Sequence, residues 1–206
     1  MRLIVGFVVA LALIGGSAQA QVISPNDRPP PGAGGDGPAV FREPDGQIFE
    51  AVEGGGARHK LTGFICPLEI ESFTRSKLAV FDRSEGGRDV ACGYQRDGSW
   101  FTLYLTRLPG MSGEAVFRTY VRQAEDAAPP KGEATAPLAP GVPPLPGFSR
   151  FWINASDQVD GLWMSQIGDW HIKLRVTYEV QDEAAVKAFA EELYRQLHDQ
   201  VAAPEI

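Results

Sequence analysis

An Asp-Gly pair, Asp97-Gly98, lies between two segments rich in apolar residues. Both residues tolerate the positive φ angles of a type I′ turn, so the pair predicts a tight β-hairpin. A two-residue loop sets the strand register, in which Gln95 lies opposite Trp100 and Cys92 lies opposite Leu103. One face of this hairpin then carries the apolar side chains Val90, Cys92, Tyr94, Phe101, Leu103 and Leu105. We expect this face to lie in the core.

A second tight turn follows at Gly168-Asp169, where a glycine in the first position suits a type II′ turn. The strand that returns from it alternates between apolar and polar residues, which is typical of a strand with one buried face. Its apolar face carries Trp170, Ile172, Leu174, Val176 and Tyr178, and its polar face carries His171, Lys173, Arg175 and Thr177. Two further strands are expected, at residues 151–153 and at residues 78–81.

Each hairpin is followed by a segment with apolar residues at helical spacing. Ser112 can cap the first helix, whose apolar stripe consists of Val116, Phe117, Tyr120, Val121 and Ala124. Asp182 can cap the second helix, whose stripe consists of Val186, Phe189, Ala190, Leu193 and Leu197. Each helix needs a surface on which to bury its stripe. We therefore predict an α+β domain in which a mostly antiparallel sheet of about five or six strands packs with two helices.

The N-terminal residues have the pattern of a cleavable signal peptide at residues 1–20. Met1-Arg2 is short and positive, residues 3–14 are apolar or glycine, and Ala18-Gln19-Ala20 is a small-x-small cleavage site. The apolar run is about 12 residues long, whereas a membrane span needs about 20, so a retained anchor helix is the less favoured alternative. Cleavage near Ala20 predicts a mature protein that is periplasmic or secreted, without a stable membrane span.

Composition divides the rest of the chain. Residues 21–40 are rich in Pro and Gly and are expected to form a disordered tether, because they bury too little apolar surface to offset the entropy of ordering. Residues 41–206 suffice for a single domain, with a Pro-rich insertion at residues 129–147 that is expected to lack regular structure. The net charge of −7 disfavours nucleic acid and anionic lipid as partners. The oligomeric state stays open.

Cys66 and Cys92 are the only cysteines in the chain. We predict that they form a disulfide bond, because exported proteins meet an oxidising compartment and Cys92 points into the core from its hairpin. Two separate buried thiols are the alternative. A redox-active pair usually has Cys-x-x-Cys spacing, which this pair lacks.

Three segments, Ile65-Cys66-Pro67, Asp89-Val90-Ala91-Cys92-Gly93-Tyr94 and Thr102-Leu103-Tyr104-Leu105, resemble a pattern found in uncharacterised exported proteins of proteobacteria. The order of the expected elements is hairpin, helix, Pro-rich connection, hairpin and helix, and it resembles the antiparallel α/β sandwich of the Mog1/PsbP-like fold. The resemblance covers about residues 60–201. Proteins of the PsbP-like type are accessory or assembly subunits, so the resemblance implies an accessory role. It assigns no functional residue to this chain.

Motifs of catalysis and cofactor binding are missing from the sequence. There is no Gly-x-Ser-x-Gly elbow, and the cysteines are expected to be bonded, so a hydrolase with an activated nucleophile is disfavoured. The histidines His59, His171 and His198 lack metal-ligand spacing. The glycine-rich residues 53–58 lack the ending of a phosphate-binding loop and predict a flexible connector. We therefore predict no catalytic residue, no cofactor and no metal ligand.

The polar face of the second hairpin is the candidate interaction surface. His171, Lys173 and Arg175 project side by side from one strand, in a chain of net negative charge. The ordinary interpretation is the solvated back of a half-buried sheet. However, the residues opposite Lys173 and Arg175 are apolar, which indicates that the face is partly covered. Arg175 is the favoured anion contact because its planar group can make paired hydrogen bonds. Trp100 joins the candidates as an exposed aromatic residue.

These features favour an exported, non-enzymatic accessory protein that binds a periplasmic protein or another cell-envelope partner. Two alternatives stay open. One is a small-ligand carrier or sensor that uses a cleft between sheet and helix. The other is an enzyme of unrecognised type, which needs a cluster of perturbed titratable groups. Convergence of Trp100, His171 and Arg175 on one concavity favours a small ligand, whereas dispersal over a flat face favours a macromolecular partner.

Overall fold

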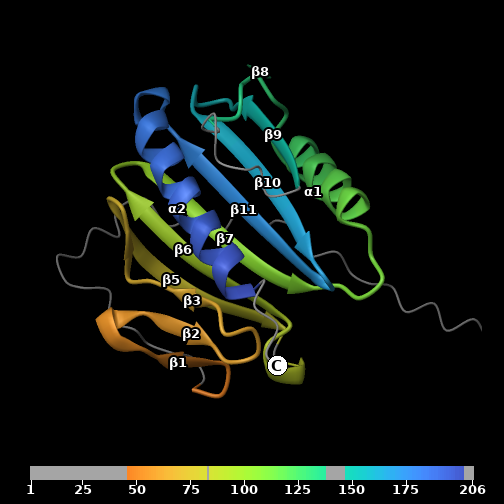
Figure 1. Cartoon of the computed structure of the whole chain (residues 1–206). Coiled ribbons are helices and arrows are strands. Elements are labelled where there is room, and N and C mark those ends of the chain that lie inside the picture. The colour runs from red at the N-terminus through yellow and green to blue at the C-terminus, as the bar shows by residue number, and fades with distance from the viewer. Residues whose placement is uncertain (1–45, 83, 138–146, 202–206) are drawn as a thin grey trace, which may run out of the picture.

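The computed structural model describes residues 46–82, 84–137 and 147–201, and Figure 1 shows how its elements are arranged. The expected signal peptide at residues 1–20 and the expected tether at residues 21–40 lie outside the described residues. Residues 138–146 of the Pro-rich insertion and the side chain of His198 also lie outside them. The described residues form two β-sheets and two α-helices.

The larger sheet has eight antiparallel strands in the order β4-β5-β6-β7-β11-β10-β9-β8. They are β4 (Glu69–Ile70), β5 (Phe73–Asp82), β6 (Asp89–Arg96), β7 (Ser99–Arg107), β8 (Gly132–Glu133), β9 (Gly147–Ile153), β10 (Val159–Ile167) and β11 (Trp170–Tyr178). A 3₁₀ turn, η3 (Ser84–Gly86), lies between β5 and β6. The hairpins β6–β7 and β10–β11 meet through the antiparallel pairing of β7 with β11, which places them side by side at the centre of the sheet.

The smaller sheet consists of β1 (Phe49–Ala51), β2 (Ala57–His59) and β3 (Ile65–Cys66), in that order. A 3₁₀ turn, η2 (Glu53–Gly55), joins β1 to β2, so the glycine-rich segment that predicts a flexible connector includes a tight turn and most of β2. The smaller sheet lies beyond β5 in Figure 1. Its buried apolar residues belong to the same hydrophobic core as those of the larger sheet.

The predicted α+β class with five or six strands is wrong. The structure is mostly antiparallel sheet, with eight strands in one sheet and three in another, and only two short α-helices accompany them. The prediction missed β1, β2, β3, β4 and β8, which are each two or three residues long. A strand this short does not show the alternation of apolar and polar residues that reveals longer strands. No feature of this sheet supports the Mog1/PsbP-like sandwich expected with that class.

Both predicted hairpin registers are confirmed. Gln95 lies opposite Trp100 across the first turn, and Asp97 and Gly98 have positive φ angles of 32° and 85°. The second hairpin has the register predicted from Gly168-Asp169, and Gly168 has a φ angle of 57°. Glycine adopts such angles without steric cost, which is why these two turns can be located in the sequence.

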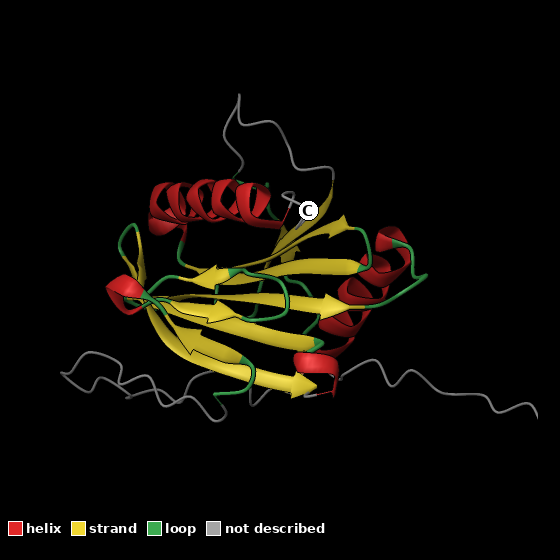
Figure 2. Ribbon diagram, turned by 60° about the horizontal axis from the view of Figure 1, so that its bottom comes forward, coloured by secondary structure: helices red, strands yellow, loops and turns green. Residues whose placement is uncertain are grey.

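The two helices lie on opposite faces of the larger sheet (Figure 2). α2 (Glu183–Val201) follows a 3₁₀ turn, η4 (Val180–Asp182), and its predicted apolar stripe is fully buried in the core formed with both hairpins. α1 (Gly113–Ala127) has its main contacts with β9 and β10 on the other face. Only Gly113 and Val116 of α1 are buried, so this helix is packed less deeply than α2.

The start of α1 is held by β10 rather than by its expected cap. Ser112 occupies the N-cap position, but its side chain makes no capping hydrogen bond. Instead, Gln166 Oε1 accepts a hydrogen bond from the Gly113 amide at 2.8 Å, and Gln166 Nε2 donates to the Met111 carbonyl at 3.2 Å. A Cβ atom at position 113 would stand 2.9 Å from Gln166 Oε1, so glycine allows this close approach.

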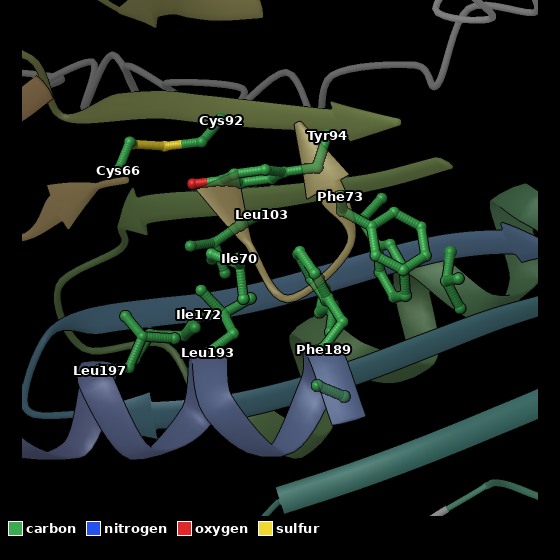
Figure 3. Packing of buried hydrophobic residues seen from close by; sticks show 14 of the residues in the cluster. Cys66, Ile70, Phe73, Cys92, Tyr94, Leu103, Ile172, Phe189, Leu193 and Leu197 are labelled. Atoms are coloured by element: carbon green, nitrogen blue, oxygen red, sulfur yellow. A yellow bond between two sulfur atoms is a disulfide. The ribbon is translucent and has the colours of Figure 1, made fainter. Parts of the chain in front are cut away.

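Phe189 of α2 is at the centre of the aromatic core shown in Figure 3. Its ring centroid lies 4.0 Å from that of Phe101, 5.0 Å from that of Phe73 and 5.2 Å from that of Tyr94. These rings come from β5, β6 and β7, so one side chain of α2 joins three strands. Aromatic pairs at such distances contribute dispersion energy in addition to the burial of apolar area.

The predicted disulfide bond between Cys66 and Cys92 is confirmed, and it joins β3 of the smaller sheet to β6 of the larger sheet (Figure 3). Arg75 of β5 reinforces the same junction, since its buried guanidinium donates to the carbonyls of Cys66 at 2.5 Å and Gly55 at 2.8 Å. The Tyr94 hydroxyl of β6 donates to the carbonyl of Pro67, the residue after β3, at 3.2 Å. The two sheets are therefore fastened by a covalent bond and by hydrogen bonds from largely buried side chains.

Part of the Pro-rich run at residues 129–147 is paired with the larger sheet. Gly132–Glu133 form β8 opposite Ile153 and Trp152 of β9, and Gly147 begins β9. Arg150 of β9 forms ion pairs with Glu133 and with Glu125 of α1. These contacts join the run and α1 to β9.

Candidate functional site

The four predicted site residues share the face of the larger sheet on which α1 lies, which we call the α1-side face. Trp100 belongs to β7, and His171, Lys173 and Arg175 belong to β11. Their placement follows from strand alternation, because the intervening apolar residues belong to the core beneath α2. The polar face predicted from the second hairpin is therefore continuous with the outer face of the first.

These residues spread over the α1-side face rather than converging. Trp100 lies opposite Thr177 and Arg175 lies opposite Thr102, which makes Trp100 and Arg175 diagonal neighbours about 7–8 Å apart. His171 is four residues from Arg175, or roughly 13 Å along the strand. An arrangement of this kind suits an extended contact surface better than a small-ligand site.

Lys173 is largely enclosed by tyrosines. Its Nζ lies 4.0 Å from the ring centroid of Tyr104 on β7 and 3.6 Å from that of Tyr120 on α1. The residue is only 7% exposed. A cation over an aromatic face is attracted by the ring quadrupole, and this attraction grows when water is excluded. Lys173 therefore connects α1 to the sheet.

Asp89 of β6 belongs to the same cluster. Its carboxylate accepts a hydrogen bond from the Thr106 hydroxyl at 2.9 Å. Burial raises the pKa of Asp89, and this rise is opposed by the Thr106 hydrogen bond and by the positive charge of Lys173. Burial, together with the charge of Asp89, raises the pKa of Tyr120 to about 12. At neutral pH the cluster thus combines a neutral phenol with a partly buried acid close to a lysine.

His171 lies at the end of the α1-side face nearest the start of α1. It pairs with Thr106 of β7 and Gln166 of β10, and it is only 1% exposed. Burial lowers the pKa of His171. A neutral, enclosed imidazole is poorly placed to meet a partner, so His171 contributes to the packing of this end of the sheet.

Arg175 differs from the enclosed residues beside it. It is half-buried, and no carboxylate within residues 46–82, 84–137 and 147–201 forms an ion pair with it. Lys77 of β5 lies in the same cross-strand row, which runs from Lys77 through Gly93 and Thr102 to Arg175.

The side chain of Lys77 crosses β6 at a glycine. A Cβ atom on Gly93 would stand only 2.7 Å from Lys77 Cγ, so the lysine stem lies directly over this position. Lys77 is exposed and, like Arg175, has no ion-pair partner among the described carboxylates. Two cations on one row of an acidic protein are therefore available to a negatively charged group.

The sequence did not predict that Asp89, Tyr104 and Tyr120 lie close to Lys173. Tyr104 lies opposite Lys173 only because β7 pairs with β11, and no turn motif links those two strands. Tyr120 was expected simply as part of an apolar helix stripe. Its helical spacing with Val116 indicates that it faces the sheet, but spacing alone does not identify the residue that it meets.

No group of three or more His, Cys, Asp or Glu side chains in the described part of the chain is arranged to hold a metal ion. None of the helices in that part of the chain combines the length and apolar character needed to cross a bilayer.

No family model, curated protein or solved structure matches this chain. The comparisons therefore supply no relative from which a residue role could be transferred.

We expect the stability of the protein to fall as the pH is lowered below about 6.5, the usual pKa of histidine. Burial lowers the pKa of His59, which is fully buried, and that of His171. Below pH 6.5 these histidines bind protons more readily in the unfolded chain than in the folded chain. The stability that the two neutral histidines contribute is therefore complete above pH 6.5 and is lost progressively as the pH falls toward their folded pKa values. Thermal midpoints measured between pH 8 and pH 5 test the direction of the change.

A matched variant isolates the contribution of His59. In His59→Asn the amide can still bond the Thr62 hydroxyl, which lies 2.8 Å from His59 Nδ1, but it does not titrate. This variant should show a shallower decline of the midpoint with falling pH, whatever its midpoint at pH 8. An unchanged slope would contradict the assignment. Asp89 acts in the opposite direction, because its raised pKa lets the folded state bind a proton more readily than the unfolded state does.

Proposed function

We propose that this is an exported, non-enzymatic accessory protein that binds an acidic segment of a periplasmic or other cell-envelope partner. The contact surface would be the part of the α1-side face formed by β5, β6, β7 and β11, with Arg175 as the anion contact and Trp100 as a neighbouring aromatic contact. The observation that carries the proposal is Arg175. This half-buried guanidinium lies beside Trp100 and has no carboxylate partner among the described residues.

A partner-bound arginine explains features that a purely structural one does not. An arginine that serves the fold normally bonds carboxylates or carbonyls, as Arg150 does with Glu125 and Glu133 and as Arg75 does with two backbone carbonyls. The guanidinium of Arg175 is available to make paired hydrogen bonds to an external carboxylate. The exposed Lys77 would add positive charge on the same row.

Two features support export. The first 20 residues have the pattern of a cleavable signal peptide. The Cys66–Cys92 disulfide bond is of the kind that persists in oxidising compartments outside the cytoplasm. We place the mature protein in the bacterial periplasm or beyond it on this basis.

Affinity capture tests the proposal. The wild-type protein and Arg175→Gln would each be immobilised and exposed to a cell-envelope extract, and the bound polypeptides would be quantified by mass spectrometry. The amount of a specific partner bound to the variant should be at least roughly tenfold smaller than the amount bound to the wild type, because a hydrogen bond to a charged group contributes about 1.5–3 kcal/mol. The thermal midpoint of the variant should stay close to that of the wild type, since the Arg175 side chain makes no hydrogen bond or ion pair to another described residue.

The control is Arg122→Gln, which removes the same charge from an exposed position of α1. It should leave recovery unchanged. Lys173 is unsuitable for this test because its contacts with Tyr104 and Tyr120 serve the fold. Equal recovery on wild type and Arg175→Gln refutes the proposed site.

A further inference from the structure

β5 presents a backbone edge that the described residues leave largely unpaired. Its neighbour β4 pairs only with Phe73 and Thr74, and the Arg75 amide then donates to the Leu68 carbonyl. Beyond that point, residues 76–82 make no backbone hydrogen bond on the side away from β6 to any described residue. Such an edge can accept a further strand, because its outward N–H and C=O groups are arranged as a ladder.

Two irregularities limit the usable length of this edge. The pairing of β5 with β6 shifts between Arg75 and Lys77, and again between Val80 and Asp82. Between these shifts the four residues 77–80 pair regularly with β6. Bulges of this kind protect an edge against open-ended self-association, since they twist the strand away from a long flat partner. They leave room for a short extended segment.

The side chains of residues 77–80 define what such a segment would carry. Leu78 and Val80 pack against the hydrophobic core but stay partly exposed, so they offer apolar contacts on one face. Lys77 and Ala79 are on the α1-side face, and Lys77 has no carboxylate partner in the described chain. In a paired strand the residues directly opposite stand about 4.5–5.5 Å apart, within reach of a lysine.

We propose that the partner of this protein contributes an extended segment that adds to β5 along residues 77–80. The segment alternates acidic and apolar residues, with the carboxylate next to Lys77 and the apolar side chains next to Leu78 and Val80. This inference rests on the proposed function and specifies the form of the partner. The added strand would lie four strand spacings, roughly 19 Å, from Arg175 on β11, so a different part of the same partner would contact Arg175.

Amide hydrogen exchange followed residue by residue by NMR tests the inference. The probes are two acetylated octapeptides, one alternating Glu and Val and one alternating Lys and Val. The Glu-Val peptide should slow exchange of the outward-pointing amides in residues 77–80 by roughly tenfold or more, because those amides gain hydrogen bonds. The Lys-Val peptide should have little effect. Lys77→Glu should reverse this preference, and the control Arg122→Glu should not.

Three outcomes overturn the inference. The first is unchanged exchange at residues 77–80 up to roughly 1 mM Glu-Val peptide. The second is slow exchange of the outward amides in the free protein at every protein concentration, which means that another part of this chain already covers the edge. The third is protection that grows with protein concentration, which means that a second copy covers it. If one of these outcomes is seen but Arg175→Gln still captures less partner than the wild type, strand addition fails and the proposed function stands. If capture is insensitive to Arg175, the proposed function itself fails.

Discussion

Replacing Phe189 with alanine should lower the free energy of unfolding by about 3–5 kcal/mol. The ring is fully buried and packs against Phe101, Phe73 and Tyr94, so its removal leaves a cavity where α2 meets three strands. Denaturant titration followed by tryptophan fluorescence measures the loss. Phe189→Leu, which refills part of the cavity, should lose less than Phe189→Ala.

Phe81→Ala is the control for this substitution. Phe81 is 39% exposed and stacks on Tyr104 at the edge of the sheet, with a centroid distance of 6.0 Å. Its removal should cost roughly 1 kcal/mol or less, because little buried area and no closed cavity are involved. If the two alanine variants lose equal stability, α2 does not pack on the sheet as described.

Removing the disulfide bond should lower the free energy of unfolding by about 3.5 kcal/mol. Cys66 and Cys92 are separated by 26 residues, and closing a loop of that length reduces the conformational entropy of the unfolded chain. The double variant Cys66→Ala, Cys92→Ala should therefore melt roughly 10 °C below the wild type. The bond joins the two sheets, so its loss should release the smaller sheet first.

Reduction of the wild-type protein provides the matched comparison. Both sulfurs are buried, so a reducing agent should act slowly on the folded protein and quickly once denaturant is present. The reduced wild type should then resemble the double variant in stability. A double variant as stable as the oxidised wild type would contradict a role for the bond in joining the sheets.

Local signals explain which parts of the fold could be predicted from the sequence. Asp97-Gly98 and Gly168-Asp169 set the registers of two hairpins because their turn chemistry admits few alternatives. The stripe of α2 could be predicted because its five residues recur at helical spacing, and in the structure all five are buried. The disulfide followed from the expected compartment and from the inward orientation of Cys92.

The rest of the fold depends on contacts between segments that are distant in sequence. Strands β1 to β4 and β8 are too short to carry a pattern of their own, and they exist because longer neighbours offer them a ladder. The pairing of β7 with β11 joins the two hairpins, yet neither strand contains a motif that selects the other. Tertiary context decides such pairings, as it often overrides local propensity.

The candidate surface was predicted in part for the same reason. Alternation along β11 placed His171, Lys173 and Arg175 on one face. It could not show that His171 and Lys173 are enclosed while Arg175 stays available. That distinction depends on where Tyr120 of α1 meets the sheet. It separates Arg175 from Lys173, although the two residues are equivalent in the sequence pattern.

The most direct test of partner binding through the α1-side face is photo-crosslinking in intact cells. The photoreactive residue p-benzoylphenylalanine would replace Gln95, which is exposed beside Trp100 on that face, or Ala184, which is exposed on α2 at the opposite face. We predict a discrete adduct from the Gln95 position, lost when Arg175→Gln is added, and none from the Ala184 position. No adduct at Gln95, or the same adduct from both positions, would contradict the account.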